Sequence, residues 1–233
     1  MTIKLPSRLK KIAQLVPKGS RLADIGTDHG YIPIYLLQNE MTPFVIAGDV
    51  NEKPLESAKE NIKQYGYEAV AETRLGSGLE VLKPGEVDTV IIAGMGGLLI
   101  SDILQNDPEV ASSIHTFILQ PMQTPEVLRR YLVKHGFQIK QDILVQEDHR
   151  IYEIILTEKG HQVVADDIQY EIGFFIESNP PEVAMAFIEK KSKQVERIIE
   201  SLEKSTLEEH VEKVQASQEK LIKLREVHAC LKK

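Results

Sequence analysis

Residues 21–37 read RLADIGTDHGYIPIYLL, and this stretch decides the fold. A short apolar run leads into a turn bounded by Gly26 and Gly30, and an apolar segment of helical length follows. A buried strand, a glycine turn and a helix in this order begin the nucleotide-binding half of a doubly wound α/β domain. The turn nevertheless carries Asp28 and His29 where a phosphate-binding loop presents bare backbone. The sequence therefore predicts a nucleotide-type turn built for a different ligand.

Strand patterns and helix patterns alternate along the first two thirds of the chain. Strands are expected at residues 21–26, 44–49, 87–93 and 115–121, a strand with a short helix at 71–82, longer helices at 6–16, 31–38, 51–66 and 124–136, and an antiparallel hairpin at 137–160. This alternation predicts an α/β fold with a mostly parallel, seven-stranded sheet and helices on both faces. Asn51 and Thr124 are expected to cap the helices that they precede, and Pro121 to end its strand.

Residues from about Asp166 onward carry no strand pattern, which predicts two domains, residues 1–163 and residues 164–233. Apolar residues at near-heptad spacing form two stripes in the second domain, Phe187, Val195, Ile198 and Leu202, then Leu207, Val211, Val214, Leu221, Leu224 and Leu231. We expect an antiparallel helical hairpin, similar to a short coiled coil, with its corner at Ser205 or Thr206. This hairpin is expected to be too thin to bury a core of its own.

The topology also predicts where a ligand binds. In mostly parallel sheets the site lies beyond the carboxyl ends of the strands, where the strand order reverses. Glycine-rich, acidic or polar turns occur at that edge: Gly26–Gly30, Asp49, Gly76–Gly78, Gly94–Gly97 and Gln120–Pro121.

The composition is ordinary for a globular protein, with 42% hydrophobic and 27% charged residues among 233. The sequence shows no secretory signal pattern and no apolar run of membrane-spanning length. Cys230 is the single cysteine, which excludes an internal disulfide and a cysteine zinc cluster. We therefore expect a cytoplasmic protein with no membrane partner, and a monomer.

The net charge is −7, which argues mildly against a nucleic-acid partner. The first 21 residues are an exception, because they contain no acid and several bases: Lys4, Arg8, Lys10, Lys11, Lys18 and Arg21. Two interpretations stay open, a basic helix that meets RNA phosphates and a solvated amphipathic helix.

The acidic turn itself narrows the choice of ligand. A dinucleotide-binding turn needs a middle glycine, and Asp28 stands in that region instead. At about 4 Å, a carboxylate repels each pyrophosphate charge by roughly 4 kcal/mol near a protein surface. The same carboxylate favours a cationic ligand such as S-adenosylmethionine, which has an ammonium, a sulfonium and no phosphate. Asp49, 19 residues after Gly30, can accept hydrogen bonds from ribose hydroxyls, although it can also cap the next helix.

Five segments occur in the chain in one order: RLADIGTDHGYIPIYLL, IAGDVNEKPLESAKENI, RLGSGLEVL, DTVIIAGMGG and ILQP. Together they resemble the bacterial tRNA (adenine-N1)-methyltransferase family of the TrmK type, over nearly the whole chain. The resemblance implies a class I, Rossmann-like methyltransferase fold for residues 1–163, with S-adenosylmethionine as cofactor, tRNA as substrate and no metal. The expected reaction is methylation of the N1 ring nitrogen of adenine 22.

The resemblance also implies site residues. The methionine part of the cofactor is expected near Asp24, Gly26, Asp28, His29 and Gly30. The ribose and adenine of the cofactor are expected near Asp49, Val50, Gly76, Ser77 and Gly78. The reacting methyl group is expected to face Ala93, Gly94, Met95 and Gly96. The RNA substrate is expected to meet Arg8, Lys10, Lys11, Tyr31, Met95 and Gly96.

Residues Ala93–Gly97 offer no side-chain amide or carboxylate to polarise an exocyclic amine, and this suits a ring-nitrogen acceptor. Positioning is then the main task of the enzyme. Asp28 is the first candidate for stabilising the cationic adenine and taking its proton, and His29 is the second, because imidazole can accept a proton near neutral pH.

Simpler interpretations stay open for several residues. His29 can bond the backbone of its own turn, Met95 can be ordinary packing, and Gly94, Gly96 and Gly97 can serve close backbone approach. The segment Asp148–Arg150, near Glu153, is interpreted as a charged hairpin loop rather than a metal site.

Further basic side chains are candidates for RNA contact. Arg129, Arg130 and Lys134 are expected to grip phosphates. Lys190, Lys191, Lys193 and Arg197 are expected to read the shape of the tRNA or to serve only as a brace. Other functions stay open as well: a small-molecule methyltransferase, an NAD-dependent oxidoreductase, or an RNA-binding module that keeps a cofactor pocket.

Overall fold

The computed structural model describes residues 2–203 and 210–232. The chain forms two compact units, residues 1–163 and residues 164–233. The predicted corner at Ser205 or Thr206, and Leu207, lie outside the described residues.

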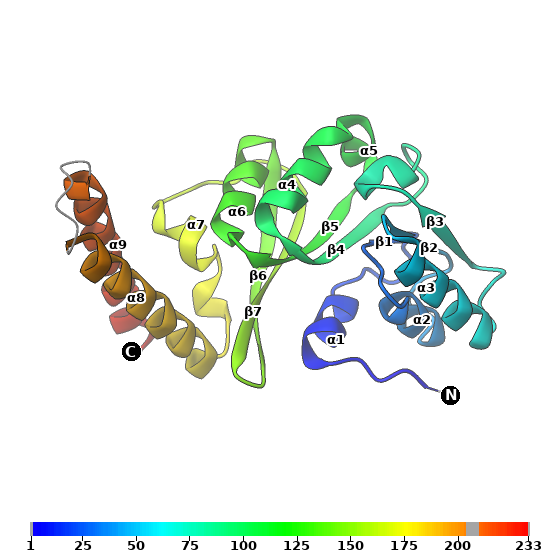
Figure 1. Cartoon of the computed structure of the whole chain (residues 1–233), viewed down its shortest axis with the longest axis horizontal. Helices are drawn as coiled ribbons and strands as arrows, with labels where there is room; N and C mark the ends of the chain where they lie inside the picture. The colour runs from blue at the N-terminus through cyan, green and yellow to red at the C-terminus, as the bar shows by residue number, and fades with distance from the viewer. Residues whose placement is uncertain (1, 204–209, 233) are drawn as a thin grey trace. The chain divides into compact units, whose positions relative to one another are not determined.

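The first unit is built on a seven-stranded sheet with the order β3-β2-β1-β4-β5-β7-β6 (Figure 1). The strands are β1 (Leu22–Ile25), β2 (Val45–Asp49), β3 (Ala71–Leu75), β4 (Thr89–Gly96), β5 (Thr116–Gln123), β6 (Phe137–Glu147) and β7 (Arg150–Lys159). Strands β1 to β5 run parallel, while β7 runs antiparallel to both β5 and β6. The predicted mostly parallel, seven-stranded sheet is therefore confirmed.

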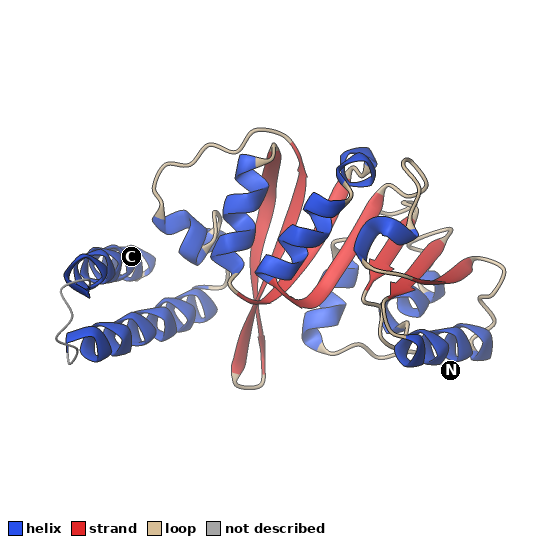
Figure 2. Cartoon of the chain, turned by 45° about the horizontal axis from the view of Figure 1, so that its top comes forward, coloured by secondary structure: helices blue, strands red, loops and turns tan. Residues whose placement is uncertain are grey.

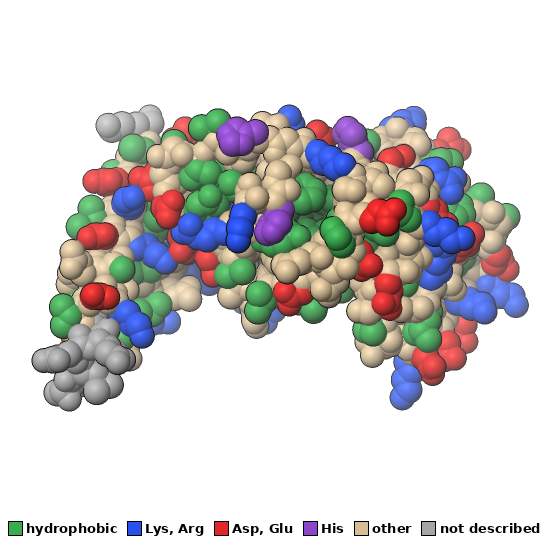
Figure 3. All heavy atoms as spheres, turned by 90° about the horizontal axis from the view of Figure 1, so that it is seen from above, with side chains coloured by type: hydrophobic (Ala, Val, Ile, Leu, Met, Phe, Trp, Pro, Cys, Tyr) green, Lys and Arg blue, Asp and Glu red, His purple; other side chains and the backbone are tan. Residues whose placement is uncertain are grey.

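Helices cover both faces of this sheet. They are α1 (Ser7–Gln14), α2 (Tyr31–Gln38), α3 (Glu52–Gln64), the short 3₁₀ helix η1 (Gly78–Val81), α4 (Gly97–Asn106), α5 (Pro108–Ser113) and α6 (Pro125–Lys134). Helices α1 to α3 lie on one side and α4 to α6 on the other (Figure 2). Every residue of β1 and β2 is buried, because a parallel strand covered on both faces has no solvent side. On the side of α4 to α6, positive and negative side chains are interspersed (Figure 3).

Two predicted helix caps differ in detail from the structure. Asn51 precedes α3 as expected, but its side chain makes no cap bond, and its backbone N–H donates to Oδ1 of Asp49 at 2.8 Å. Thr124 precedes α6 in the left-handed region (φ +47°) and makes no side-chain cap bond, while Pro125 does occupy the first turn. A β-branched residue rarely adopts this conformation, so its neighbours must hold it there.

The end of β5 also departs from the prediction. Pro121 does not end the strand, which continues to Gln123. The pairing of β4 with β5 shifts register at Met95, opposite Pro121. A proline is tolerated in a strand where the ladder is irregular, because no N–H is needed there.

The expectation that Arg129 grips phosphates is wrong. Arg129 is completely buried and forms a bidentate pair with Asp142, at 2.7 Å for both bonds, and a third bond of 2.7 Å to Glu153. The ion pairs join α6 to the β6–β7 hairpin. Glu153 is therefore a partner of Arg129 and not part of the charged hairpin loop around Asp148.

The second unit contains more than a helical hairpin. Its elements are α7 (Ile168–Ile172), the 3₁₀ helix η2 (Ile176–Ser178), α8 (Pro181–Glu203) and α9 (His210–Leu231). Bonds from Arg225 to Glu196 (2.9 Å) and between His228 and Glu189 (3.2 Å) show that α8 and α9 run antiparallel. Lys220 and Lys223 of α9 bind acids of the segment that contains α7, at 2.6 and 2.7 Å.

The expectation that this unit buries no core is wrong at one end. Residues of α7 and η2, which the sequence analysis did not single out, join the two long helices there. The buried apolar residues are Ile168, Tyr170, Ile172, Ile176, Ala184, Phe187, Ile188, Val195, Leu221 and Leu224. Toward the other end the predicted stripe fails, because Ile198 and Val211 are exposed.

None of the helices in the described part of the chain has the length and apolar character needed to cross a bilayer.

Replacement of Arg129 by Met should destabilise the first unit by about 3–5 kcal/mol, because two buried carboxylates then lack a counter-charge. Chemical denaturation monitored by circular dichroism measures this. The neighbouring Arg130 is exposed, so Arg130→Met is the matched control and should change stability little. Equal stabilities of the two variants would contradict a structural role for the buried ion pairs.

Candidate active site

A pocket of about 260 Å³ opens beyond the carboxyl ends of β1 and β4. It is lined by Arg8, Leu9, Asp24, Gly26, Thr27, Asp28, His29, Tyr31, Ile32, Ala93 and Gly94. Strands β1 and β4 are neighbours in the sheet, and β2 leads away from β1 on the other side. The pocket therefore lies where the strand order reverses, as the topology predicts.

The glycine turn is fastened to the end of β2. The backbone N–H groups of Gly26 and Thr27 both donate to the carbonyl of Gly48, at 2.8 and 3.1 Å. Gly26 has φ +77°, and a Cβ at this position would collide with Cε of Met95. The Met95 methyl is the far end of a flexible side chain and could move aside, so the positive φ is the stronger reason for glycine here. Asp28 also lies in the left-handed region, with φ +54°, which an aspartate tolerates better than most residues.

Asp24, the next-to-last residue of β1, is a buried acid in the wall of the pocket. Its Oδ2 accepts a hydrogen bond of 2.8 Å from the hydroxyl of Thr27. Burial raises the pKa of Asp24 to about 7, the Thr27 bond opposes this rise, and the nearby charge of Asp49 adds to it. A carboxyl in this state becomes fully charged only when a cation stabilises it or the pH rises.

Asp28 and His29 point their side chains toward each other at the pocket wall. Oδ1 of Asp28 lies 3.5 Å from Nε2 of His29, and the two side chains are 70% and 44% exposed. The other ring nitrogen of His29 is 2.7 Å from Oγ of Ser57, and Asn61 donates to the His29 carbonyl at 2.9 Å. The simpler interpretation, in which the imidazole bonds its own turn, is wrong, because α3 holds the ring.

Arg8 enters the pocket from α1 instead of lying on the surface with Lys10. Its Nη1 donates to Oε1 of Gln120 at 2.5 Å, and its guanidinium lies 5.1 Å from the centre of the Tyr152 ring. Its backbone N–H donates to Glu147 at 2.8 Å. Its Nε is buried without a hydrogen-bond partner among the described residues. A buried cationic donor of this kind favours an anionic ligand group.

Gln120, in the second half of β5, bonds several groups next to Arg8. It is completely buried, and its Oε1 also accepts a bond of 3.2 Å from the backbone N–H of Gly94. Its Nε2 donates to the Pro121 carbonyl at 2.9 Å. One amide thus connects Arg8 of α1 to Gly94 near the end of β4.

Asp49 connects the pocket to the loop after β3. It is buried, and its Oδ2 lies 3.4 Å from the backbone N–H of Asp28. Its carbonyl accepts a bond of 3.0 Å from the N–H of Gly76. The N–H of Ser77 donates to the carboxylate of Glu80 in η1. Val50, next to Asp49, is largely exposed.

The predicted site residues fall into two groups. Those that line the pocket are Arg8, Asp24, Gly26, Asp28, His29, Tyr31, Ala93 and Gly94. Those outside its lining are Lys10, Lys11, Gly30, Asp49, Val50, Gly76, Ser77, Gly78, Met95 and Gly96. Of these, Asp49 and Met95 contact the turn directly. The glycines at the junction of β4 and α4 also differ, since Gly97 packs against the Thr124 backbone whereas Gly94 and Gly96 have open space at Cβ.

The sequence analysis missed several residues of the site. Leu9, Thr27 and Ile32 line the pocket, and Ser57 and Asn61 hold its polar groups. Gln120 was expected at this edge of the sheet, but its bond to Arg8 was not. Ser57 and Asn61 are four residues apart on α3, a spacing that places both on one helix face. Within residues 2–203 and 210–232, no group of three or more His, Cys, Asp and Glu side chains gathers as a metal site would require.

Comparisons with known proteins agree with this geometry. A family model described as "Methyltransferase domain" matches residues 5–155. The tRNA (adenine(22)-N(1))-methyltransferase of Bacillus subtilis (strain 168) is 35% identical over 175 residues, which cover 75% of this chain and 74% of that protein.

Solved structures resemble the whole chain. The structure of Streptococcus pneumoniae Sp1610 in complex with S-adenosyl-L-methionine matches with 34% identity and a TM-score of 0.81, covering 94% of this chain and 100% of that one. The structure of M. capricolum TrmK in complex with S-adenosyl-homocysteine matches with 29% identity and a TM-score of 0.82, covering 97% of this chain and 99% of that one. The acidic glycine turn, the pocket at the switch point and these relatives lead to one conclusion: the chain belongs to the bacterial tRNA (adenine(22)-N(1))-methyltransferase family.

Proposed function

We propose that this protein transfers a methyl group from S-adenosylmethionine to N1 of adenine 22 in tRNA, and that the pocket beyond β1 and β4 is where it does so. The observation that carries the proposal is a pocket with two carboxylates, Asp24 and Asp28, and one guanidinium, Arg8. This set of charges matches a ligand with cationic groups and a single carboxylate. Family membership supplies the identity of the base.

The residues present fit the cofactor. S-adenosylmethionine carries an ammonium and a carboxylate, and it supplies a methyl group bound to a positively charged sulfur. Asp24 and Asp28 provide the negative charge that the cationic groups require. The Arg8 guanidinium, whose Nε has no hydrogen-bond partner among the described residues, suits the carboxylate, because a charged donor bonds a carboxylate more strongly than a neutral donor does. We therefore assign Arg8 to the cofactor rather than to RNA phosphate.

The cofactor's ribose and adenine then extend toward the ends of β2 and β3. Asp49 faces the turn at the end of β2 and is assigned to the ribose hydroxyls. Val50, Gly76, Ser77 and Gly78 are assigned to the adenine of the cofactor. The exposed Val50 is suited to cover an aromatic ring.

The substrate adenine enters from the open side of the pocket, beside Asp28, His29 and Tyr31. Methylation at N1 makes the ring cationic, and the Asp28 carboxylate is placed to stabilise that charge. His29 is held by Ser57 and faces Asp28, so it keeps the carboxylate in position and is the second group able to accept a proton. Met95 and Gly96 are assigned to the wall against the base.

The exposed Lys10 and the half-buried Lys11 on α1 are assigned to phosphates of the tRNA. The protein is proposed to act as a monomer in the cytoplasm, where tRNA is found.

The direct experiment is incubation with labelled S-adenosylmethionine and unmodified tRNA, followed by nucleoside analysis and mapping. The proposal expects 1-methyladenosine at position 22. Label in another nucleoside, or transfer only to a small molecule, would contradict it.

The variant Asp28→Asn should lower the rate of methyl transfer by about 100-fold or more, because the charge beside the adenine is lost. Asparagine tolerates the left-handed backbone as aspartate does, so the turn is preserved. Single-turnover kinetics measures the loss, while tRNA binding should be unchanged. The matched control is Asp148→Asn, since Asp148 is also left-handed (φ +52°) and lies outside the pocket. A full rate for Asp28→Asn would remove Asp28 from the mechanism.

The variant Arg8→Met should weaken binding of S-adenosylmethionine about tenfold, because a charge-assisted bond to the carboxylate is lost. Decarboxylated S-adenosylmethionine lacks that carboxylate, so its Kd should be the same for wild type and variant. Isothermal titration calorimetry with both compounds measures this, and Lys10→Met is the control. Equal weakening toward both compounds would contradict the assignment.

Affinity for S-adenosylhomocysteine should fall as the pH drops below about 7, by up to about tenfold per pH unit. The raised pKa of Asp24 means that its carboxyl holds a proton below that pH and must lose it before it can pair with the ligand ammonium. The variant Asp24→Asn should bind more weakly and show a flatter pH dependence. Calorimetry between pH 5.5 and pH 8 tests this, and an unchanged slope in the variant would show that another group titrates.

A further inference from the structure

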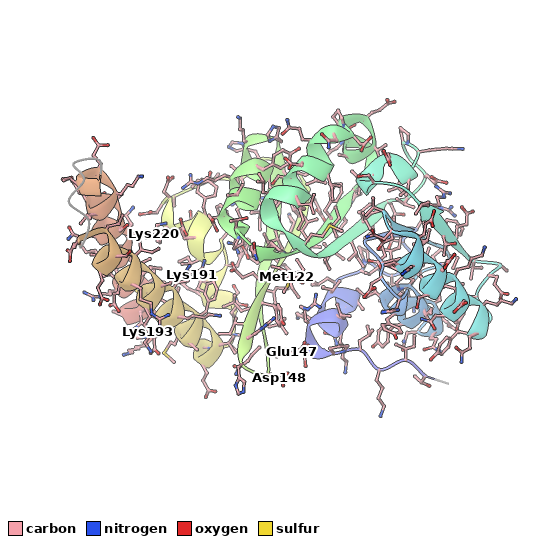
Figure 4. The ribbon with its side chains drawn as sticks, in the orientation of Figure 1. Met122, Glu147, Asp148, Lys191, Lys193 and Lys220 are labelled. Carbon is pink, nitrogen blue, oxygen red and sulfur yellow. The ribbon has the colours of Figure 1, made fainter. Side chains whose placement is uncertain are left out.

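Three large apolar side chains are exposed beside the pocket. Leu98 and Leu99, in the first turn of α4, are 59% and 51% exposed, and Met122, near the end of β5, is 43% exposed. Figure 4 shows Met122 at the end of β5, clear of the hairpin tip where Glu147 and Asp148 lie. We call Leu98, Leu99 and Met122 the apolar rim.

The residues of the apolar rim come from two chain segments that lie side by side. Gly96 pairs with Gln123 across the ends of β4 and β5. A Cβ on Gly97 would meet the backbone carbonyls of Gln123 and Thr124, so the start of α4 lies directly against the end of β5. The two leucines and Met122 therefore belong to neighbouring chain segments.

The apolar rim is continuous with the pocket. Gly94 of the pocket wall leads through Met95 and Gly96 into the first turn of α4. On the other side, Nε2 of Gln120 lies 3.5 Å from Sδ of Met122, while Oε1 of the same amide bonds Arg8 inside the pocket. The apolar rim is therefore joined to the pocket wall on two sides, through the β4–α4 connection and through Gln120.

The chemistry of the rim indicates which part of the RNA meets it. Residues 93–101 contain no charged side chain, and neither do residues 116–123. Phosphates are bound by Lys, Arg and polar donors, so this segment is unsuited to the backbone of an RNA. Flat, apolar base faces are the complementary surface. An adenine must also leave its stack before its ring nitrogen can reach a pocket, and a base exposed in this way leaves a gap.

We propose that Leu98 and Met122, supported by Leu99, form an apolar wedge that contacts the base faces next to the target adenine and keeps that adenine out of the stack. The inference rests on the proposed function, because it needs an RNA base as substrate. Other proteins that deform nucleic acids insert Leu, Met or Phe between bases in this manner. The pocket then holds the extruded base, while the rim occupies the space that the base has left.

The test compares Leu98→Ser, Met122→Ser and the double variant with the wild type. Val163→Ser is the matched control, since Val163 is 72% exposed and lies outside the pocket. The first substrate is unmodified tRNA, and the second is the same tRNA with abasic nucleotides on both sides of the target adenine. A tRNA with 2-aminopurine at the target position reports unstacking by its fluorescence.

The proposal expects the double variant to lose about tenfold in kcat/KM on tRNA, since a stacking contact has that order of effect. It should bind S-adenosylhomocysteine as the wild type does. On the abasic substrate the double variant and the wild type should be equal, because no neighbouring base remains to stack. Wild type should raise the 2-aminopurine fluorescence on binding, and the double variant should raise it less.

Two results would overturn the proposal. One is an equal loss of kcat/KM by the double variant on both substrates, which would mean that the rim acts through the stability of the fold or binds a protein partner. The other is full activity of the double variant on tRNA. Failure of the wild type to methylate tRNA at all is a separate result, which would contradict the proposed function itself.

Discussion

The site depends on one constraint: hydrogen bonds that hold the acidic turn, residues 26–30, against the end of strand β2. Two N–H groups of the turn share the carbonyl of Gly48, and the N–H of Asp28 lies near the carboxylate of Asp49. These contacts hold Asp24, Asp28 and Asp49 around one end of the sheet. Burial raises the pKa of Asp24, and the negative charge of Asp49 adds to that rise. The arrangement is stabilised when a cationic ligand binds, which gives the pocket its preference.

The same constraint explains why neighbouring residues have little freedom. Gly26 has a positive φ, which favours glycine, and the Met95 side chain lies against it where β4 and β5 shift register. Gln120 then joins the end of β4 to Arg8. The turn, the end of β4 and Arg8 are therefore linked by one connected set of contacts.

Much of the fold follows from the sequence, because its patterns are local and periodic. Apolar runs of four to eight residues predicted the strands, and their alternation with helices predicted the sheet and the end at which the pocket opens. The errors arose where tertiary contacts overrule local preference. Arg129 resembles a surface base in sequence, yet two acids of the β6–β7 hairpin, distant along the chain, bury it. Pro121 continues a strand because the opposite strand is irregular at that point.

In the site, too, residues placed by a local motif were predictable, and residues placed by tertiary contacts were not. Residues of the turn were predictable, since a short motif places them together, and Asp24, Asp28 and His29 do line one pocket. Arg8 was assigned to RNA because five other bases lie near it in sequence, and only the fold shows that its side chain enters the pocket. Gln120 and Ser57 act through side-chain bonds to residues 112 and 28 positions away, for which a single sequence carries no signal.

The central claim is that the acidic turn selects a cationic methyl donor over a phosphate-bearing coenzyme. Calorimetric titration of the same protein with S-adenosylmethionine and with NAD, each alone and then in competition, tests it most directly. The account predicts saturable binding of S-adenosylmethionine that NAD does not displace. Binding of NAD in the same pocket, with displacement of S-adenosylmethionine, would contradict it.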